Sequence, residues 1–282
     1  PFIRNKSNIK TFFFFVYFVN CHPKEFLKVI SMPSLNDLVN FCNHRVSLDR
    51  IKDFSGSFNG LQIENNGSVN KVGAAVDAGL VPFKNATERN VDFLIVHHGL
   101  FWIPPIPLTG ANYSKIQHCI KNNLAVYGSH LPLDCHPEIG NNAILASRLD
   151  LPQAGTFLNY EGNDIGLITH CQFSRKELSQ RLNELFPRGI NAMEFGPKKP
   201  LKIAILSGSG QSAFEEIEQI GADTFITGEL KQHHFNLAQE QNLNVYTCGH
   251  YATETFGVQT LGKEVATNFD LPFEFIDTEC PL

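Results

Sequence analysis

The chain has 282 residues, of which 43% are hydrophobic and 18% are charged, and its formal net charge is −5 at pH 7. This composition predicts one large or two medium folded domains and excludes a disordered or fibrous protein. Residues 1–31 hold five cations and one anion, so residues 32–282 carry a net charge of −9. An acidic body without basic clusters argues against nonspecific binding to nucleic acid or to an anionic membrane.

The first 31 residues differ from the rest of the chain. Their apolar run Phe12–Val19 is too short to span a membrane, and no small-x-small cleavage site follows it. Met32 then opens a helical segment. We interpret residues 1–31 as an extension outside the folded protein, and we expect a chain that begins at Met32 to fold and to bind metal like the full chain.

The seven cysteines are scattered and never form a Cys-x-x-Cys motif. Their arrangement matches neither a disulfide framework nor a thiolate zinc site, and it suits a reducing compartment. We therefore predict a cytoplasmic protein.

From Met32 onward, segments with helical signals alternate with short apolar runs. Ser34 can cap a helix through about Val46, and Ser174 with Glu177 predicts a capping box at a second helix. Repeated strand–helix units predict an α/β fold with largely parallel sheets and right-handed crossovers. The expected strands are 72–76, 93–96, 124–127, 165–169, 203–206, 224–226, 245–247 and 273–276. We expect one domain at 32–150, completed by about 245–282, and a second domain at 151–244.

Three of these apolar runs lead to residues that commonly bind metals. The run 93–96 leads to His97 and His98, the run 124–127 to Asp134, and the run 245–247 to His250 and Glu254. The carboxyl ends of strands in open α/β sheets are where ligands collect. His250 and Glu254 are four residues apart at the start of a helix, so they share one face.

Three imidazoles and two carboxylates suit two divalent ions of the borderline class, such as Zn²⁺, Mn²⁺, Fe²⁺ or Ni²⁺. Adjacent side chains on a strand diverge, so His97 and His98 could serve two ions better than one. Alone, this pair is equally consistent with a polar loop. Asp134 or Glu254 could bridge two ions, which would lower the pKa of a bound water and polarise a substrate oxygen. We assign no catalytic side chain and no organic cofactor.

Three further residues have two interpretations each. His130 shares a stretch with Asp134, Trp102 follows the histidine pair, and Glu229 ends an apolar run. Each could contact a metal-bound side chain or the substrate, or could simply pack in the structure.

Two other motifs could suggest ligand binding. His233-His234 imitates the first histidine pair, but it lies within a predicted helix, which favours a surface or rim position. The loop Ser207–Gly210 precedes a helix and could present amides to a phosphate. It lacks the lysine of a phosphate-binding P-loop, so a tight structural turn is an equally good interpretation.

Six short sequence blocks carry a resemblance to a known family, which they match in order and spacing. They are Phe58–Gln62, His97–Trp102, Ser129–Asp134, Ser207–Gln211, Thr227–Glu229 and Gly249–Glu254. Together they resemble the YbgI-like dinuclear metal-centre family, often labelled GTP cyclohydrolase I type 2 homologues. The resemblance runs from about Pro33 to Ile276. Carried over by motif position, the metal ligands of the family fall on the five candidates named above. The resemblance further implies two intertwined α/β domains, a metal pair in the cleft between them, and a ring-shaped homohexamer.

The resemblance also implies an activity. It suggests a divalent-metal-dependent hydrolase that opens the imidazole ring of GTP with metal-activated water and releases formate. No residue in the sequence specifies guanine, so two alternatives stay open. One is a hydrolase that acts on a phosphoester or amide of another metabolite, and the other is a non-enzymatic metal-binding scaffold or partner protein.

Overall fold

The computed structural model describes residues 33–102 and 107–282, and Met32–Leu282 forms one compact unit of mixed α/β structure. The extension predicted for residues 1–31 lies outside the described residues. Within the described ranges, no helix is long and apolar enough to cross a membrane.

The first sheet has five strands, which lie across the sheet in the order β1 (Gly60–Ile63), β4 (Ala125–Gly128), β3 (Phe93–His98), β2 (Val72–Asp77) and β11 (Phe273–Phe275). The strands from β4 to β11 are parallel, and β1 is antiparallel to β4. The carboxyl ends of β3 and β4 therefore meet at one edge of this sheet.

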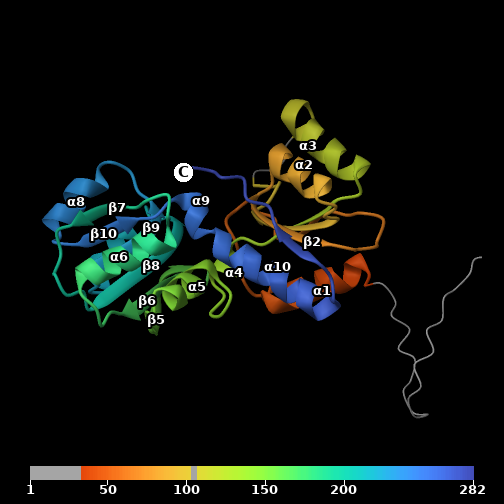
Figure 1. Cartoon of the computed structure of the whole chain (residues 1–282). Coiled ribbons are helices and arrows are strands. Elements are labelled where there is room, and N and C mark those ends of the chain that lie inside the picture. Colours follow the sequence, from red (N-terminus) through yellow and green to blue (C-terminus); the bar gives the residue numbers. More distant parts are fainter. Residues whose placement is uncertain (1–32, 103–106) are drawn as a thin grey trace, which may run out of the picture. The chain divides into compact units, whose positions relative to one another are not determined.

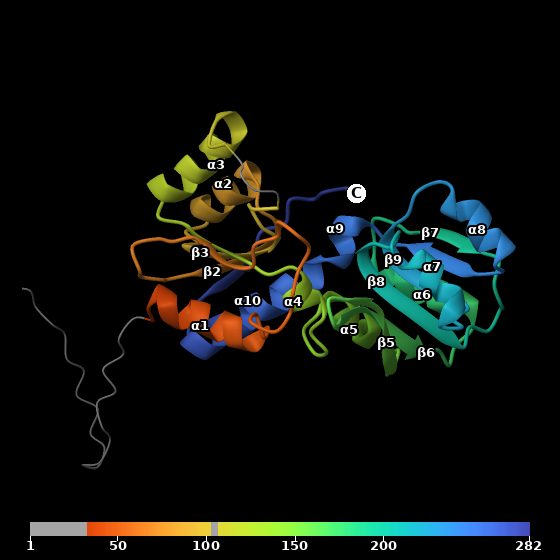
Figure 2. The ribbon, with the colours of Figure 1, turned by 180° about the vertical axis from the view of Figure 1, so that it is seen from behind.

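Helices cover both faces of the first sheet (Figures 1 and 2). On one face lie α1 (Leu35–Arg45) and α10 (Thr255–Phe269), and on the other lie α2 (Leu80–Glu88) and α3 (Gly110–Lys121). Successive residues of β3 alternate between these two cores, because side chains on a strand point to opposite faces. A strand buried on both faces must be apolar along its length, which explains the run of four hydrophobic residues before His97.

The second sheet has six strands, again in spatial order: β5 (Gln153–Tyr160), β6 (Asn163–His170), β8 (Lys202–Ser209), β9 (Thr224–Glu229), β10 (Asn244–Thr247) and β7 (Asn191–Glu194). Only β8, β9 and β10 run parallel to one another. One core packs α5 (Asn141–Arg148) and α6 (Arg175–Leu185) on this sheet, and a second packs α7 (Phe214–Gln219) and α8 (His234–Glu240).

Both sheets are mixed: the first is largely parallel with one antiparallel strand, β1, whereas the second pairs more strands antiparallel than parallel, so the prediction of largely parallel sheets is wrong for the second sheet. In the second sheet, β5 and β6 form an antiparallel hairpin through Glu161 and Gly162. These two residues have φ of 50° and 92°, the left-handed values that a two-residue hairpin loop needs. β5 and β7 are mostly exposed, so neither carries the apolar run that predicts the other strands.

Two short helices carry residues of the predicted site. α4 (Leu131–Asp134) follows β4, and α9 (His250–Thr253) follows β10 and leads into α10. Gly249 begins the turn into α9 with φ of 94°, a conformation that strongly favours glycine. The ends of strands from both sheets therefore contribute side chains to the predicted site.

Candidate metal centre

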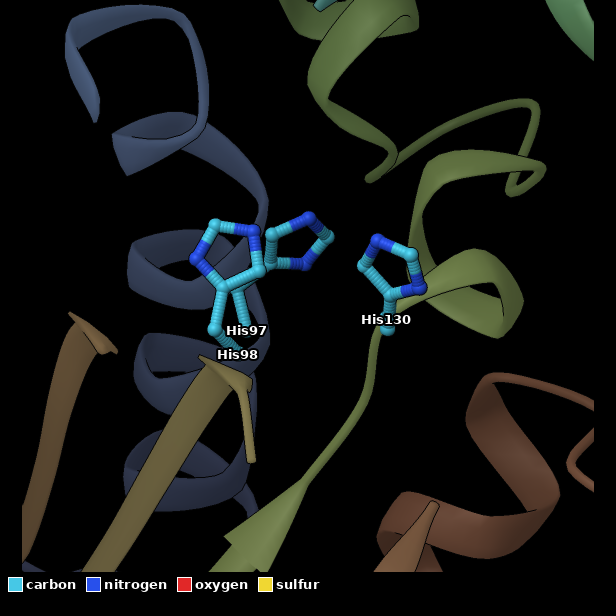
Figure 3. A group of neighbouring side chains, drawn as sticks. All are labelled: His97, His98 and His130. Carbon is cyan, nitrogen blue, oxygen red and sulfur yellow. The ribbon is translucent and has the colours of Figure 1, made fainter. Parts of the chain in front are cut away.

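Four histidines gather at the carboxyl ends of three strands. His97 and His98 end β3, His130 precedes α4, and His250 begins α9. Figure 3 shows the ring of His130 facing the two histidines of β3. The ring centroid of His97 lies 4.9 Å from those of His98 and His130, and His98 lies 5.6 Å from His250. The structure thus brings together residues that are more than 150 positions apart in the sequence.

Each of the four imidazoles has an oxygen acceptor at Nδ1. The contacts are His97 to the Ser129 carbonyl (3.0 Å), His98 to Asp77 (2.8 Å), His130 to Asp53 (2.9 Å) and His250 to Glu229 (3.1 Å). A carbonyl or carboxylate oxygen accepts, so the Nδ1 atom carries the proton and donates it. In a neutral ring the Nε2 atom then holds the lone pair, which is the arrangement of a metal-binding histidine.

Two carboxylates lie among the Nε2 atoms. Glu254 Oε1 is 3.3 Å from His250 Nε2 and 3.6 Å from His97 Nε2, and its Oε2 is 3.2 Å from His98 Nε2. Asp134 Oδ2 lies 3.3 Å from His97 Nε2. All five ligand candidates from the sequence therefore lie in one group.

The group contains buried polar atoms without a hydrogen-bond partner among the described residues, namely His97 Nε2 and Glu254 Oε2. Their short distances to neighbouring groups do not have hydrogen-bond geometry. An unpaired buried polar atom costs about 1–3 kcal/mol. A cation that took both lone pairs would remove this cost, and imidazole nitrogen with carboxylate oxygen is a donor set of borderline divalent ions. The residues present therefore fit a metal ion.

The electrostatics of the group also favour positive charge. Burial by itself raises the pKa of Glu254, but the surrounding histidines hold it well below its ordinary value. Burial lowers the pKa of His97, yet Asp134 and Glu254 together raise it above its ordinary value. The hydrogen bond to Glu254 raises the pKa of His250 to about 9. The site thus keeps Glu254 ionised and draws in either protons or metal.

Two sets of three side chains could each hold a metal ion, because their ligand atoms lie within 4.8 Å of one another. The sets are His97, His98 and His130, and His98, His250 and Glu254. Asp134 belongs to neither set, although it contacts His97. His130 belongs to the first set, although its sequence position suggested a neighbour of the ligands rather than a ligand.

Asp53 fixes the ring of His130. Its nearly buried carboxylate accepts hydrogen bonds from His130 Nδ1 (2.9 Å), Leu131 N (3.0 Å), Asn59 Nδ2 (2.8 Å) and Phe54 N (2.6 Å). Burial by itself raises the pKa of Asp53, but the hydrogen bond and charge of His130 lower it to about 2. An ionised carboxylate with four donors holds His130 in one orientation.

A cavity of about 360 Å³ opens beside the ligand group, and Asp134, His250 and Glu254 line it. Trp102 also lines the cavity, with its ring centroid 5.7 Å from that of His98 and 4.8 Å from that of His130. This volume is typical of sites for small molecules. A substrate in the cavity would lie against the side chains that could hold metal.

The Ser207–Gly210 segment is structural, and its first three residues are the irregular end of β8, where the pairing with β9 shifts register. The amides of Ser207, Gly208 and Gly210 donate to Asn142 Oδ1, Thr253 Oγ1 and the Glu229 carbonyl, respectively. Those amides are therefore not free to bind a phosphate. Gly208 has φ of 64°, and a Cβ atom there would collide with Glu254 Oε1. Glycine at this position lets the loop approach the ligand group.

Of the remaining candidates from the sequence, Glu229 lies at the ligand group and the pair His233-His234 does not. Glu229 ends β9 and contacts His250, as described above. The second histidine pair lies elsewhere: His234 Nδ1 donates to the Lys231 carbonyl at 3.0 Å, and its ring packs 4.9 Å from Phe214. His233 is exposed. This pair therefore takes no part in the group.

Sequence reasoning missed two carboxylates that orient histidines. Asp77 ends β2 and lies beside His98 in the parallel pairing of β2 with β3. Its position after the apolar run 72–76 is the same signal that identified His97, so it could have been found. Asp53 lies in a loop and meets His130 across 77 positions. No local pattern marks that contact.

Comparison with known proteins gives consistent matches. Residues 33–281 match the family model described as Duf34/NIF3 (NGG1p interacting factor 3). A "GTP cyclohydrolase 1 type 2 homolog" of Deinococcus radiodurans is 34% identical over 223 residues, which cover 78% of this chain and 85% of that protein. A protein of the same name from Archaeoglobus fulgidus is 34% identical over 246 residues, which cover 86% and 98%. The solved structure of protein ybgI, described as of unknown function, matches with a TM-score of 0.81 and 31% identity, covering 88% of this chain and 100% of that one.

Proposed function

The chain belongs to the DUF34/NIF3 family, and from this premise we propose that it is a hydrolase dependent on two divalent metal ions. The proposed ligands are His97, His98, Asp134, His250 and Glu254. The observation that carries the proposal is the orientation of the imidazoles, each held at Nδ1 and each aiming Nε2 at the carboxylates. Contacts of this kind orient a ligand and raise its basicity.

The chemistry follows from the donor set. Bound at these residues, a pair of zinc, manganese, iron or nickel ions would supply a hydroxide at neutral pH and polarise a substrate oxygen. Glu254 offers its two oxygens to different histidines, which suits a bridging carboxylate. Asp134 is held by Asn141 Nδ2 at 2.8 Å. His130, fixed by Asp53 and facing the cavity, is within reach of a substrate and can hold or accept a proton there.

The reaction that we propose is the opening of the imidazole ring of a guanine nucleotide, with release of formate. Its support is the name carried by the relatives and a cavity of suitable volume beside the ligands. We further propose that the two sheets belong to two intertwined domains, 32–150 completed by 245–282 and 151–244, with the ions in the cleft between them.

Metal content tests the ligand assignment. We expect Asp134→Ala and His250→Ala to lose about half or more of the metal that the unaltered chain retains, because each removes a ligand atom. The exposed residues His233 and Asp49 provide matched controls, since His233→Ala and Asp49→Ala should retain the metal. If the first two variants bind as much metal as the unaltered chain, the assignment is wrong.

Turnover by the metal-loaded full chain tests the reaction. Formate release from GTP that disappears in Asp134→Ala would support ring opening. Hydrolysis of a phosphoester or amide from a panel of metabolites would support the proposal of a hydrolase. It would also show that the substrate is not the proposed guanine nucleotide. If metal is bound and no candidate turns over, the chain acts as a metal-binding scaffold.

The assembly that we propose is a ring-shaped homohexamer in the cytoplasm. Light scattering on the purified chain should then give a mass about six times the 31.5 kDa of one chain. A mass of one or two chains at micromolar concentration would contradict it.

A further inference from the structure

The cavity beside the ligand group has two different walls. Outside the ligand group and His130, the side chains that line it are Phe54, Trp102, Leu131, Ile165, Leu206, Ser207, Ser209, Gln211 and Ser212. One wall is aromatic and comes from the segments around β1 and after β3. The other consists of uncharged hydroxyl and amide side chains at the end of β8 and directly after it, and the aliphatic Leu131, Ile165 and Leu206 complete the lining.

The aromatic wall is built around His130. The ring of Trp102 stands at 80° to His130 with centroids 4.8 Å apart, and the ring of Phe54 lies 5.7 Å from His130 at 50°. Phe54 packs edge-on against Tyr160 at 4.8 Å, yet it is still 41% exposed. Both rings contact His130, which Asp53 holds in one orientation, so both have a fixed support. Exposed aromatic surface on a rigid support is a surface on which a planar ring can stack.

The polar wall offers hydrogen bonds without charge. Ser209, Gln211 and Ser212 follow the turn at Gly208, and their side chains line the cavity. The amides of Ser207, Gly208 and Gly210 are engaged within the protein, so side chains supply most of the polar contacts on this wall. Hydroxyl and amide groups donate and accept, which matches the edge of a heterocycle with both kinds of atom.

We propose that this cavity selects its substrate by an uncharged, planar nitrogen heterocycle, as in a nucleobase or nucleoside, and not by phosphate groups. The ring stacks on Trp102 and Phe54, and its polar edge faces Ser209 and Gln211. This places the ring beside the residues that would hold the ions. The inference rests on the proposed function, because it describes the substrate of that same site.

The chain offers a direct readout, because Trp102 is its only tryptophan. A ring that stacks on Trp102 should quench the fluorescence of the zinc-loaded full chain, and Zn²⁺ is a redox-inert d¹⁰ ion. We expect guanosine to quench saturably, with a Kd within about threefold of that for GTP. Inorganic triphosphate and ribose 5-phosphate should neither quench nor displace guanosine. A comparison of guanine with guanosine separates recognition of the base alone from recognition of the nucleoside.

A variant pair tests the aromatic wall. Phe54→Leu should weaken guanosine binding about tenfold, since stacking on one aromatic side chain is worth roughly that factor. Phe58→Leu is the matched control, because Phe58 is also exposed (54%) but packs against Phe101 and does not line the cavity. Zinc is measured in every sample. If the unaltered chain contains no bound zinc, the proposed function is contradicted.

Three results would overturn the inference while the metal site stands. They are zinc-loaded protein that guanosine does not quench, triphosphate that displaces guanosine as well as GTP does, and Phe54→Leu and Phe58→Leu that bind guanosine equally.

Discussion

The residues that orient the histidines matter as much as the histidines themselves. A fixed acceptor at Nδ1 sets the orientation of each imidazole. The acceptors are a backbone carbonyl, at Ser129, and three carboxylates, at Asp77, Asp53 and Glu229. A carbonyl accepts the hydrogen bond without adding formal charge, whereas a carboxylate would also add negative charge near a bound ion. The four positions therefore differ in how strongly they favour a cation.

Asp77→Ala should weaken metal binding about 10–100-fold, the usual effect of removing an acceptor from a metal-bound histidine. Asp77 is 47% exposed, so the fold should tolerate the change. Competition with a chromogenic chelator measures the affinity, and circular dichroism checks the fold. A Kd for the metal equal to that of the unaltered chain would mean that His98 is not a metal ligand.

Asp53→Asn should lower the free energy of unfolding by about 2 kcal/mol at pH 7, because a charged hydrogen bond to His130 is lost. The pKa of Asp53 is about 2 in the folded chain and ordinarily 3.8. A carboxyl whose pKa is lowered by folding stabilises the folded state at pH values above its ordinary pKa. This stabilisation is lost as the pH falls through the pKa of the folded chain. The difference between the two chains should therefore shrink from about pH 4 toward pH 2.

Urea unfolding in EDTA, at several pH values, measures this difference without a metal contribution. A gap of constant size down to about pH 2.5 would mean that the hydrogen bond between Asp53 and His130 does not stabilise the fold.

At the scale of elements, a turn holds the ligand group in place. This turn is the irregular end of β8 at Gly208, which reaches Glu254 only because Gly208 has no side chain. Thr253 Oγ1 accepts from the Gly208 amide at 3.0 Å, so the turn and α9 are also joined directly. Movement of this turn would displace Glu254 from its histidines.

Gly208→Ala should therefore reduce both stability and metal affinity. Gly221 has almost the same φ (65° against 64°) but open space where a methyl group would lie, so Gly221→Ala is its matched control. The control carries backbone strain alone, about 1 kcal/mol, and should bind metal normally. Metal titration and thermal unfolding of both variants measure the two effects. Equal metal affinity would show that the turn does not support Glu254.

The sequence predicts some elements better than others. Buried parallel strands such as β3 are visible because they are apolar along their length, and the Ser34 cap of α1 is confirmed, with Asp37 N donating to Ser34 Oγ at 3.2 Å. The hairpin partner β5 is not visible, because an exposed edge strand can hold polar residues and glycine. Site residues at strand ends are predictable for the same reason that the strands are. Asp53 is not, because only the folded chain brings its loop to His130.

At the scale of the whole molecule, the ligand group joins segments that are distant in the sequence. His97, Asp134 and Glu254 come from three such segments, and a shared ion would tie them together. Binding that occurs only in the folded state stabilises that state, by about 2.7 kcal/mol when free metal is about 100 times the Kd.

EDTA should accordingly lower the Tm of the chain by at least about 5 °C, since 1 kcal/mol corresponds to about 2–4 °C at this size. Differential scanning fluorimetry measures the shift, and added zinc should restore it. His250→Ala should show a smaller shift, whereas His233→Ala should behave like the unaltered chain. Identical Tm values with and without EDTA would argue against a metal that bridges the three segments.

The proposed ligands are unevenly exposed, which has a kinetic consequence for any metal that they hold. The side chains of His97 and Glu254 are 0% and 4% exposed, whereas those of His98 and His250 are 22% and 29% exposed. Release of an ion from the His97 side would require local opening of the fold, while release from the His250 side would need only an exchange of ligands with solvent. If the group holds two ions, a chelator should therefore remove them in two phases of different rate. A chain with such a centre would keep one ion through transient metal shortage and would lose and regain the other.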